Sequence, residues 1–112
     1  MSNPLTPAVF HVLLSLAAGA RHGYAIMQDV AVHTNGKLRM GPGTLYGTID
    51  RLIAATWVEE VEPEKSAQHD ARRRYYALTR DGRRALDAEI ERLEDAVRAA
   101  RALRPASRRS RA

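Results

Sequence analysis

Apolar residues recur at helical spacing in three segments of the first half of the chain. Residues 7–19 are apolar around most of a helical circumference, which predicts a helix that is central in the fold or lies at an oligomer interface. Residues 23–32 have a narrower apolar stripe and predict a second helix. Residues 41–55 predict a third helix with one polar face and a core-facing stripe at i, i+4, i+7 and i+8, formed by Leu45, Ile49, Leu52 and Ile53.

The patterning then changes from helical to strand-like. Residues 57–62 and 72–78 are rich in strand-forming residues, and the polar stretch 63–71 between them predicts a loop. Together these segments predict a two-stranded β-hairpin, which must pack on the helices because an isolated hairpin is unstable in water. We also expect the short basic segment 37–40 to be extended.

A last helix is predicted from residue 80 to about residue 103, with Pro105 ending it. At 1.5 Å per residue it would be roughly 36 Å long, whereas the preceding domain should be only around 30 Å across. The helix therefore extends beyond its own domain, and a second copy of the chain is the simplest cover for its apolar seam. That seam repeats in steps of 4, 3, 4 and 3, as in a coiled coil, and consists of Leu86, Ile90, Leu93, Val97 and Ala100.

Composition fits one ordinary domain of 112 residues, with 45% hydrophobic and 28% charged residues. The absence of cysteine excludes disulfides, thiolate nucleophiles and cysteine-based zinc sites. The net charge is +5, but residues 98–112 hold six arginines and no acid, so the basic excess belongs to the tail. Overall charge is therefore no evidence for nucleic-acid binding, and the placement of individual residues has to decide.

Several functional classes are disfavoured by the sequence. The apolar run 8–20 has no preceding basic residue, as a signal peptide requires, and is too short to span a bilayer. No nucleophilic triad, paired-carboxylate cleft or phosphate loop is visible, so we expect no enzyme activity and no cofactor. We interpret the chain as a soluble, cytoplasmic protein that associates with the nucleoid.

The order of the elements indicates a winged helix-turn-helix. The predicted fold class is mainly α with a small β-hairpin (α+β), divided into a DNA-binding domain (1–79), a dimerisation helix (80–104) and a basic disordered tail (105–112). In such a fold the third helix enters the DNA major groove and the hairpin wing lies beside it. The predicted partners are double-stranded DNA and a second copy of the chain, with no membrane partner.

Candidate DNA contacts lie on the third helix and the wing. The polar face of the third helix offers hydroxyls, one guanidinium and a small residue, and the glycines at its start let the backbone approach a phosphate. Basic side chains before this helix and at the wing can meet phosphates or a narrow minor groove. The candidates from these positions are Arg39, Gly43, Thr44, Tyr46, Gly47, Thr48, Arg51, Arg72, Arg73 and Arg74.

Simpler interpretations remain open for these features. The polar face can be an ordinary solvated surface, and acids on the paired strand can neutralise the three wing arginines. The even spacing of His11, His22 and His33 suggests a metal site, but core, cap or surface roles are favoured because they fall on two different helices. Trp57 is expected to anchor the hairpin to the helices.

Three motifs in order resemble the PadR family of transcriptional regulators, over roughly residues 5–104. Residues 22–26 (HGYAI) are similar to a family segment on the second helix. Residues 43–46 (GTLY), with Arg51 and Leu52, are similar to the family's recognition helix. Residues 74–82 (RYYALTRDG) are similar to the junction between wing and last helix.

The resemblance implies a homodimeric repressor that binds a pseudo-palindromic operator. The last helix and the first, including Phe10, would form the dimer. Tyr46 and Thr44 would occupy DNA-contacting positions, and Tyr24 a position that supports them or touches the DNA backbone. The alternative is a protein-interaction adaptor on the same fold, which an occluded recognition face would favour.

The sequence departs from the family pattern at several positions. Gly47 replaces a proline, which loosens the recognition helix, and Ile53 replaces a common glutamate. Thr56 stands where the family has glycine, and because threonine disfavours positive φ we expect that turn to differ. Trp57 lies on the wing side, so the aromatic-ligand site that some compact relatives form between tryptophans of the last helix is not expected. Any small-molecule effector is unknown.

Overall fold

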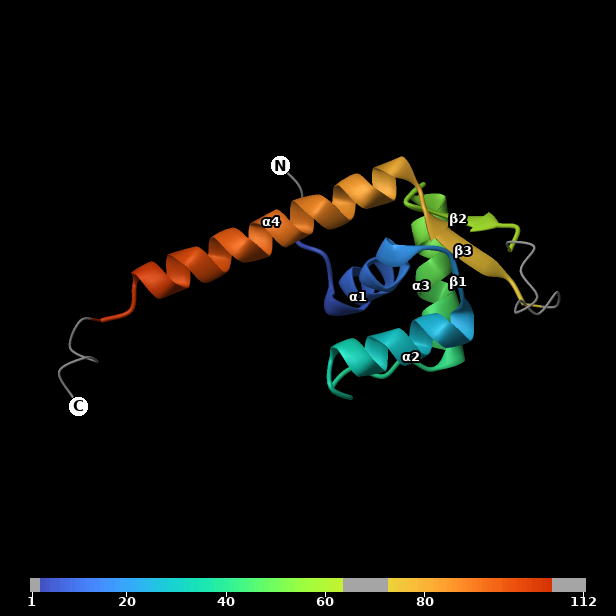
Figure 1. Cartoon of the computed structure of the whole chain (residues 1–112), viewed down its shortest axis with the longest axis horizontal. Helices are drawn as coiled ribbons and strands as arrows, with labels where there is room; N and C mark the ends of the chain where they lie inside the picture. Colours follow the sequence, from blue (N-terminus) through green and yellow to red (C-terminus); the bar gives the residue numbers. More distant parts are fainter. Residues whose placement is uncertain (1–2, 64–72, 106–112) are drawn as a thin grey trace.

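The computed structural model describes residues 3–63 and 73–105. Three helices, with a short strand between the first two, are followed by two further strands and a long last helix (Figure 1). The winged helix-turn-helix order predicted from the sequence is confirmed. The elements are α1 (Pro7–Ser15), a 3-10 turn (Leu16–Ala18), β1 (Arg21–His22), α2 (Gly23–His33), α3 (Pro42–Ala54), β2 (Val58–Val61), β3 (Tyr75–Leu78) and α4 (Arg80–Ala102).

Side chains cap the starts of three helices. The Thr6 hydroxyl accepts a hydrogen bond from the Val9 amide at 3.2 Å, and Thr79 accepts one from the Gly82 amide at 3.0 Å. His22 caps α2 in the same way, because its Nδ1 accepts from the Ala25 amide at 3.1 Å. Each cap satisfies an amide that has no partner inside its helix, so these residues fix where the helices begin.

The sheet has three strands rather than two. Its order is β1-β3-β2, with Arg21 opposite Tyr76 on one side of β3 and Val58 opposite Leu78 on the other. The predicted two-stranded hairpin is therefore incomplete, since β1 joins the wing to the start of α2. Residues 37–40, expected to be extended, pair with no strand of the described chain and add none to the sheet.

The core lies where α1, α2, α3 and the base of the sheet meet. Trp57 and Leu78 pack against its edge, which agrees with the predicted role of Trp57. Leu86 of α4 belongs to this core and is 1% exposed. The buried apolar residues are Val12, Leu13, Leu16, Ile26, Val30, Met40, Leu45, Ile49, Leu52, Val58, Tyr76 and Leu86.

The turn after α3 corrects one expectation. Thr56 adopts a φ of 65°, so threonine occupies the left-handed conformation that glycine usually provides. The Trp57 amide donates to the Leu52 carbonyl at 2.9 Å, and the Thr56 amide donates to the Ile53 carbonyl at 2.9 Å. This is the Schellman pattern of a helix C-terminus. The turn therefore keeps the geometry expected for glycine, despite the β-branched residue.

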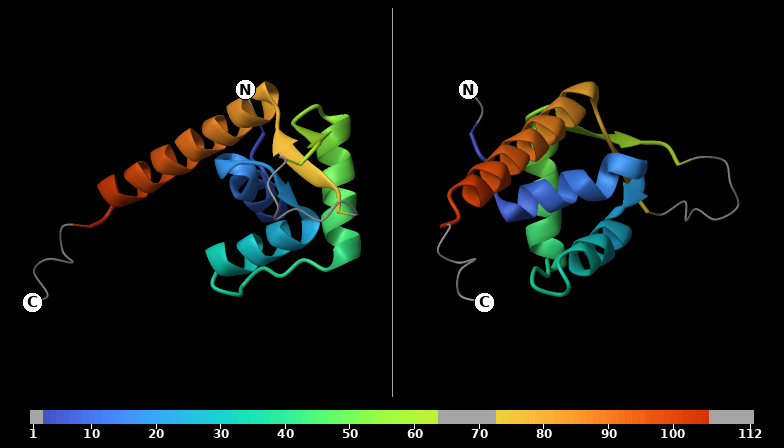
Figure 2. Two further views of the ribbon diagram at one scale, coloured as in Figure 1. Left: turned by 45° about the vertical axis from the view of Figure 1, so that its right-hand side comes forward. Right: turned by 60° about the vertical axis from the view of Figure 1, so that its left-hand side comes forward.

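Helix α4 leaves the rest of the fold. Figures 1 and 2 show its C-terminal half projecting beyond α1, α2 and α3. The principal extents of 61 × 31 × 26 Å reflect this projection, and every described residue after Ile90 is at the surface. Within residues 3–63 and 73–105, no helix combines the length and apolar character needed to cross a bilayer.

Candidate nucleic-acid interface

Helix α3 presents an exposed face that runs from its N-terminus to its last turn. Thr44, Tyr46 and Arg51 are exposed on it, together with Gly43, while Gly47 is partly buried. The helix starts at Pro42, so its first amides are open at the same end as this face. The exposed groups are therefore a hydroxyl, a phenol, a guanidinium and free backbone amides.

Thr48 does not belong to that face. It is 1% exposed, and its hydroxyl donates to the Thr44 carbonyl at 2.8 Å and accepts from Arg51 at 3.3 Å. Position 48 follows Leu45 by three residues and precedes Leu52 by four, which places it on the core-facing side. The prediction of Thr48 as a DNA contact is therefore wrong, and the residue instead helps to hold the Arg51 side chain.

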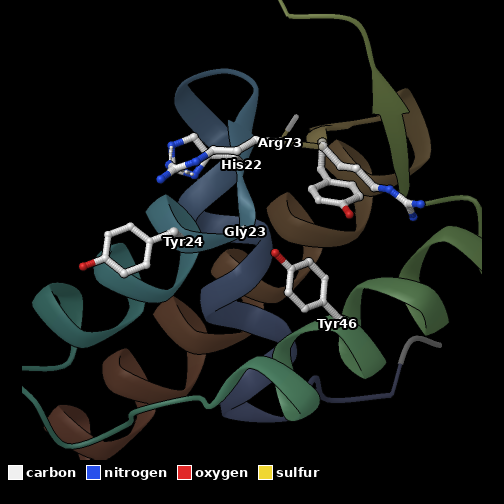
Figure 3. A pocket seen from close by; sticks show the side chains of 7 residues that line it. His22, Gly23, Tyr24, Tyr46 and Arg73 are labelled. Atoms are coloured by element: carbon white, nitrogen blue, oxygen red, sulfur yellow. Dashed lines mark hydrogen bonds between the residues drawn. The ribbon is translucent and has the colours of Figure 1, made fainter. Parts of the chain in front are cut away.

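A pocket of about 470 Å³ brings three separate parts of the sequence together beside this face (Figure 3). Tyr24 from α2 is 54% exposed, and Tyr46 from α3 is 42% exposed. Both supply aromatic surface and hydroxyl groups at the rim. The wing closes the third side with its arginines, and the lining residues are His22, Gly23, Tyr24, Tyr46, Arg73, Arg74 and Tyr76.

Arg73 is held close to the start of α2. Its Nη1 lies 2.7 Å from His22 Nε2, and its guanidinium carbon lies 5.9 Å from the Tyr24 ring centroid. The His22 ring meets Tyr75 edge-on at 5.5 Å. These contacts place the Arg73 side chain in the wall of the pocket.

Tyr76 forms the buried floor of this site. Burial, together with the nearby phenol of Tyr46 and carboxylate of Glu60, raises the pKa of the Tyr76 hydroxyl. The group is therefore protonated at neutral pH and remains a hydrogen-bond donor. With Arg73 and Arg74 above it, the pocket combines donors and positive charge, which is the chemistry that binds phosphate groups.

Other predicted DNA contacts lie elsewhere. Arg39 is exposed, and its guanidinium lies next to Gly36 in the turn between α2 and α3, apart from the pocket residues. Arg72 and the arginines of residues 106–112 lie outside the described residues. Within residues 3–63 and 73–105, no group of three His, Cys, Asp or Glu side chains is placed so that it could hold a metal ion.

The predicted dimer seam divides into two parts. Leu86 is buried in the core of its own chain, so its assignment to the dimer interface is wrong. Phe10 and Ile90 are partly buried against that core. Beyond them Leu93 is 38% and Val97 is 49% exposed, Ala100 is exposed, and a groove of about 450 Å³ runs along this part of α4.

Three residues of the pocket were not predicted as site residues from the sequence: His22, Gly23 and Tyr76. A cap was among the roles expected for His22, but its place beside Arg73 follows only from the three-dimensional contacts. Gly23 lies in the HGYAI motif but carries no chemical group to single it out. The role of each residue depends on its neighbours in the fold, which spacing alone does not disclose.

Residues 12–88 match the family model described as the transcriptional regulator PadR-like family. The chain belongs to the PadR family. This family comprises transcription regulators and not enzymes, in agreement with the expectation from the sequence. A protein of Streptomyces fradiae, described as an uncharacterized 37.1 kDa protein in transposon TN4556, is 40% identical over 78 residues. That match covers 70% of this chain but only 20% of the relative.

Solved structures agree with the PadR fold. A transcriptional regulator from Clostridium thermocellum has a TM-score of 0.68 at 21% identity, covering 88% of this chain and 90% of that chain. A PadR family transcription regulator from Clostridium difficile has a TM-score of 0.68 at 20% identity, with 84% and 94% covered. RosR of H. salinarum is 30% identical, with a TM-score of 0.61 and coverage of 96% and 86%.

Proposed function

We propose that this PadR-family chain is a DNA-binding transcriptional regulator that acts as a homodimeric repressor on a pseudo-palindromic operator. The observation that carries the proposal is the convergence of the exposed start of α3, Tyr24 of α2 and the wing arginines on one side of the fold. Helix α3 supplies groups able to read base edges, and the flanking cations and phenols supply contacts to phosphates.

The exposure of this face favours DNA over a protein adaptor role. An adaptor was expected to have its recognition face covered by the wing or by a partner. Thr44, Tyr46 and Arg51 are instead exposed, and the wing lies beside them. The free amides at the start of α3 give the face a positive end, which suits an anionic ligand.

The exposed part of α4 supports the dimer. Leu93, Val97 and Ala100 are exposed apolar positions on a helix with charged residues on its other faces. Pairing two copies along α4 would cover this surface and fix the separation of the two α3 helices. A two-fold dimer of this kind reads two half-sites about one helical turn of DNA apart.

Tyr46→Ala tests the DNA-binding proposal. Loss of this side chain should weaken binding to the operator about tenfold to hundredfold, the range expected for one contact at a protein–DNA interface. The operator would be the duplex that the purified wild-type chain selects from a randomised pool, and affinity would be measured by gel shift. Val32→Ala is the control, since Val32 is 71% exposed at the far end of α2. Wild-type affinity in Tyr46→Ala would contradict the assignment of this face.

A further inference from the structure

The Tyr46 ring lies so close to the backbone at position 23 that a residue with a side chain would clash with it. A Cβ added to Gly23 would lie 2.3 Å from the Tyr46 Oη and 2.7 Å from its Cζ. Real Cβ atoms do not approach other atoms so closely, so the Tyr46 side chain occupies the space that any other residue would fill. Figure 3 shows the Tyr46 hydroxyl directed toward Gly23 from α3.

The backbone gives no separate reason for glycine at this position. In the described chain, positive φ angles occur at Gly19, Asn35, Gly36 and Thr56, and not at Gly23. Alanine is also a better helix former than glycine, and Gly23 is the first residue of α2. Space for the Tyr46 ring is therefore the remaining requirement.

We propose that Gly23 is the positioning residue for Tyr46, holding its ring against the start of α2 so that α3 presents one fixed aromatic edge to DNA. This inference rests on the proposed function, because it assigns Tyr46 a contact with DNA. Tyr46 is 42% exposed, so its packing against position 23 limits the motion of a ring that is otherwise partly open to solvent. Fixing it in advance reduces the conformational entropy lost when DNA binds.

The Tyr46 ring is the far end of a side chain, so Gly23→Ala should displace the ring without disturbing the fold. Gly82 provides the contrast. A Cβ there would lie 2.0 Å from the backbone carbonyl oxygen of Trp57, which cannot swing away. Gly82→Ala should therefore lower the unfolding temperature, whereas Gly23→Ala should leave it close to wild type.

The test combines ring position with a double-mutant cycle. In the wild type, NMR cross-peaks should connect the Tyr46 ring protons to the Gly23 α-protons, and in Gly23→Ala the corresponding peaks should be lost. Gly23→Ala should weaken binding to the selected duplex about tenfold when Tyr46 is present, and should have no further effect in a Tyr46→Ala background.

Two results would overturn the positioning role. One is the absence of the ring cross-peaks in the wild type, and the other is an equal effect of Gly23→Ala with and without Tyr46. A wild-type chain that selects no duplex while retaining the cross-peaks would instead overturn the proposed function, and the role in DNA binding with it. The NMR measurement needs no DNA, so the two failures are distinguishable.

Discussion

The exposed seam of α4 makes a quantitative prediction for self-association. Complete burial of a leucine or valine side chain is worth about 1.5–3 kcal/mol. Leu93 is 38% exposed and Val97 is 49% exposed. Covering these exposed fractions in a dimer would contribute about 0.6–1.1 kcal/mol per chain for Leu93 and about 0.7–1.5 kcal/mol for Val97. For two chains, the pair of residues contributes roughly 3–5 kcal/mol to dimer stability.

The double variant Leu93→Ala and Val97→Ala should therefore raise the dimer dissociation constant by about a hundredfold or more. Sedimentation equilibrium over a concentration series measures this constant directly. The fold of each chain should be retained, because neither residue belongs to the core cluster. Val32→Ala, which removes a more exposed apolar side chain from α2, should leave the constant unchanged. A wild-type chain that is monomeric at micromolar concentration, or a double variant that associates as the wild type does, would refute the reasoning.

Two further substitutions address stability. Leu86→Ala should lower the free energy of unfolding by about 2–5 kcal/mol in urea titrations, because Leu86 is 1% exposed in the core; a loss of dimerisation with unchanged stability would contradict its reassignment. The hydrogen bond from Arg92 holds the pKa of Glu89 below its usual value of 4.5. Burial of the carboxylate raises this pKa, but a further hydrogen bond from the Leu5 backbone lowers it, and the net shift is downward. The contribution of the ionised Glu89 to the free energy of unfolding is present above about pH 4.5 and is lost as the pH falls further. Glu89→Gln should therefore lose less stability in acid than the wild type does.

Periodicity was sufficient to predict the helices and most of the core. Leu45, Ile49 and Leu52 are buried as their spacing indicates, and α4 begins at Arg80 after the Thr79 cap. The fourth residue of the predicted stripe, Ile53, is 38% exposed near the end of α3, so its expected place in the core is wrong. These features depend on local chain geometry, because a helix places residues three and four apart on one side. The same rule should have excluded Thr48 from the DNA face, since it shares the buried side with Leu45. A threonine hydroxyl is chemically suited to a groove contact, but its position on the helix decides whether it can reach the DNA.

Features that depend on tertiary contact could not be predicted in the same way. Strand β1 has two residues, Arg21 and His22, which is too short for any alternation to be visible. The apolar seam of α4 is buried only as far as α1 covers the helix. The spacing of the seam residues is the same on both sides of that limit, so the sequence does not show where burial ends. The contact of Gly23 with Tyr46 joins residues 23 positions apart on different helices, and nothing in the local sequence of either one indicates it.

The junction between wing and α4 connects the two proposed surfaces mechanically. The Thr79 hydroxyl donates to the Thr56 carbonyl at 2.5 Å and accepts from the Gly82 amide, while the Thr79 amide donates to the Trp57 carbonyl at 3.1 Å. These bonds tie the start of α4 to the end of α3, so α3 and the first turns of α4 should move as one body. In a dimer paired along α4, a rotation of about 5° over a helix about 35 Å long shifts the far end by about 3 Å. A ligand that changed the crossing angle of the two α4 helices would therefore change the separation of the α3 helices, and with it the half-site spacing that both can bind at once.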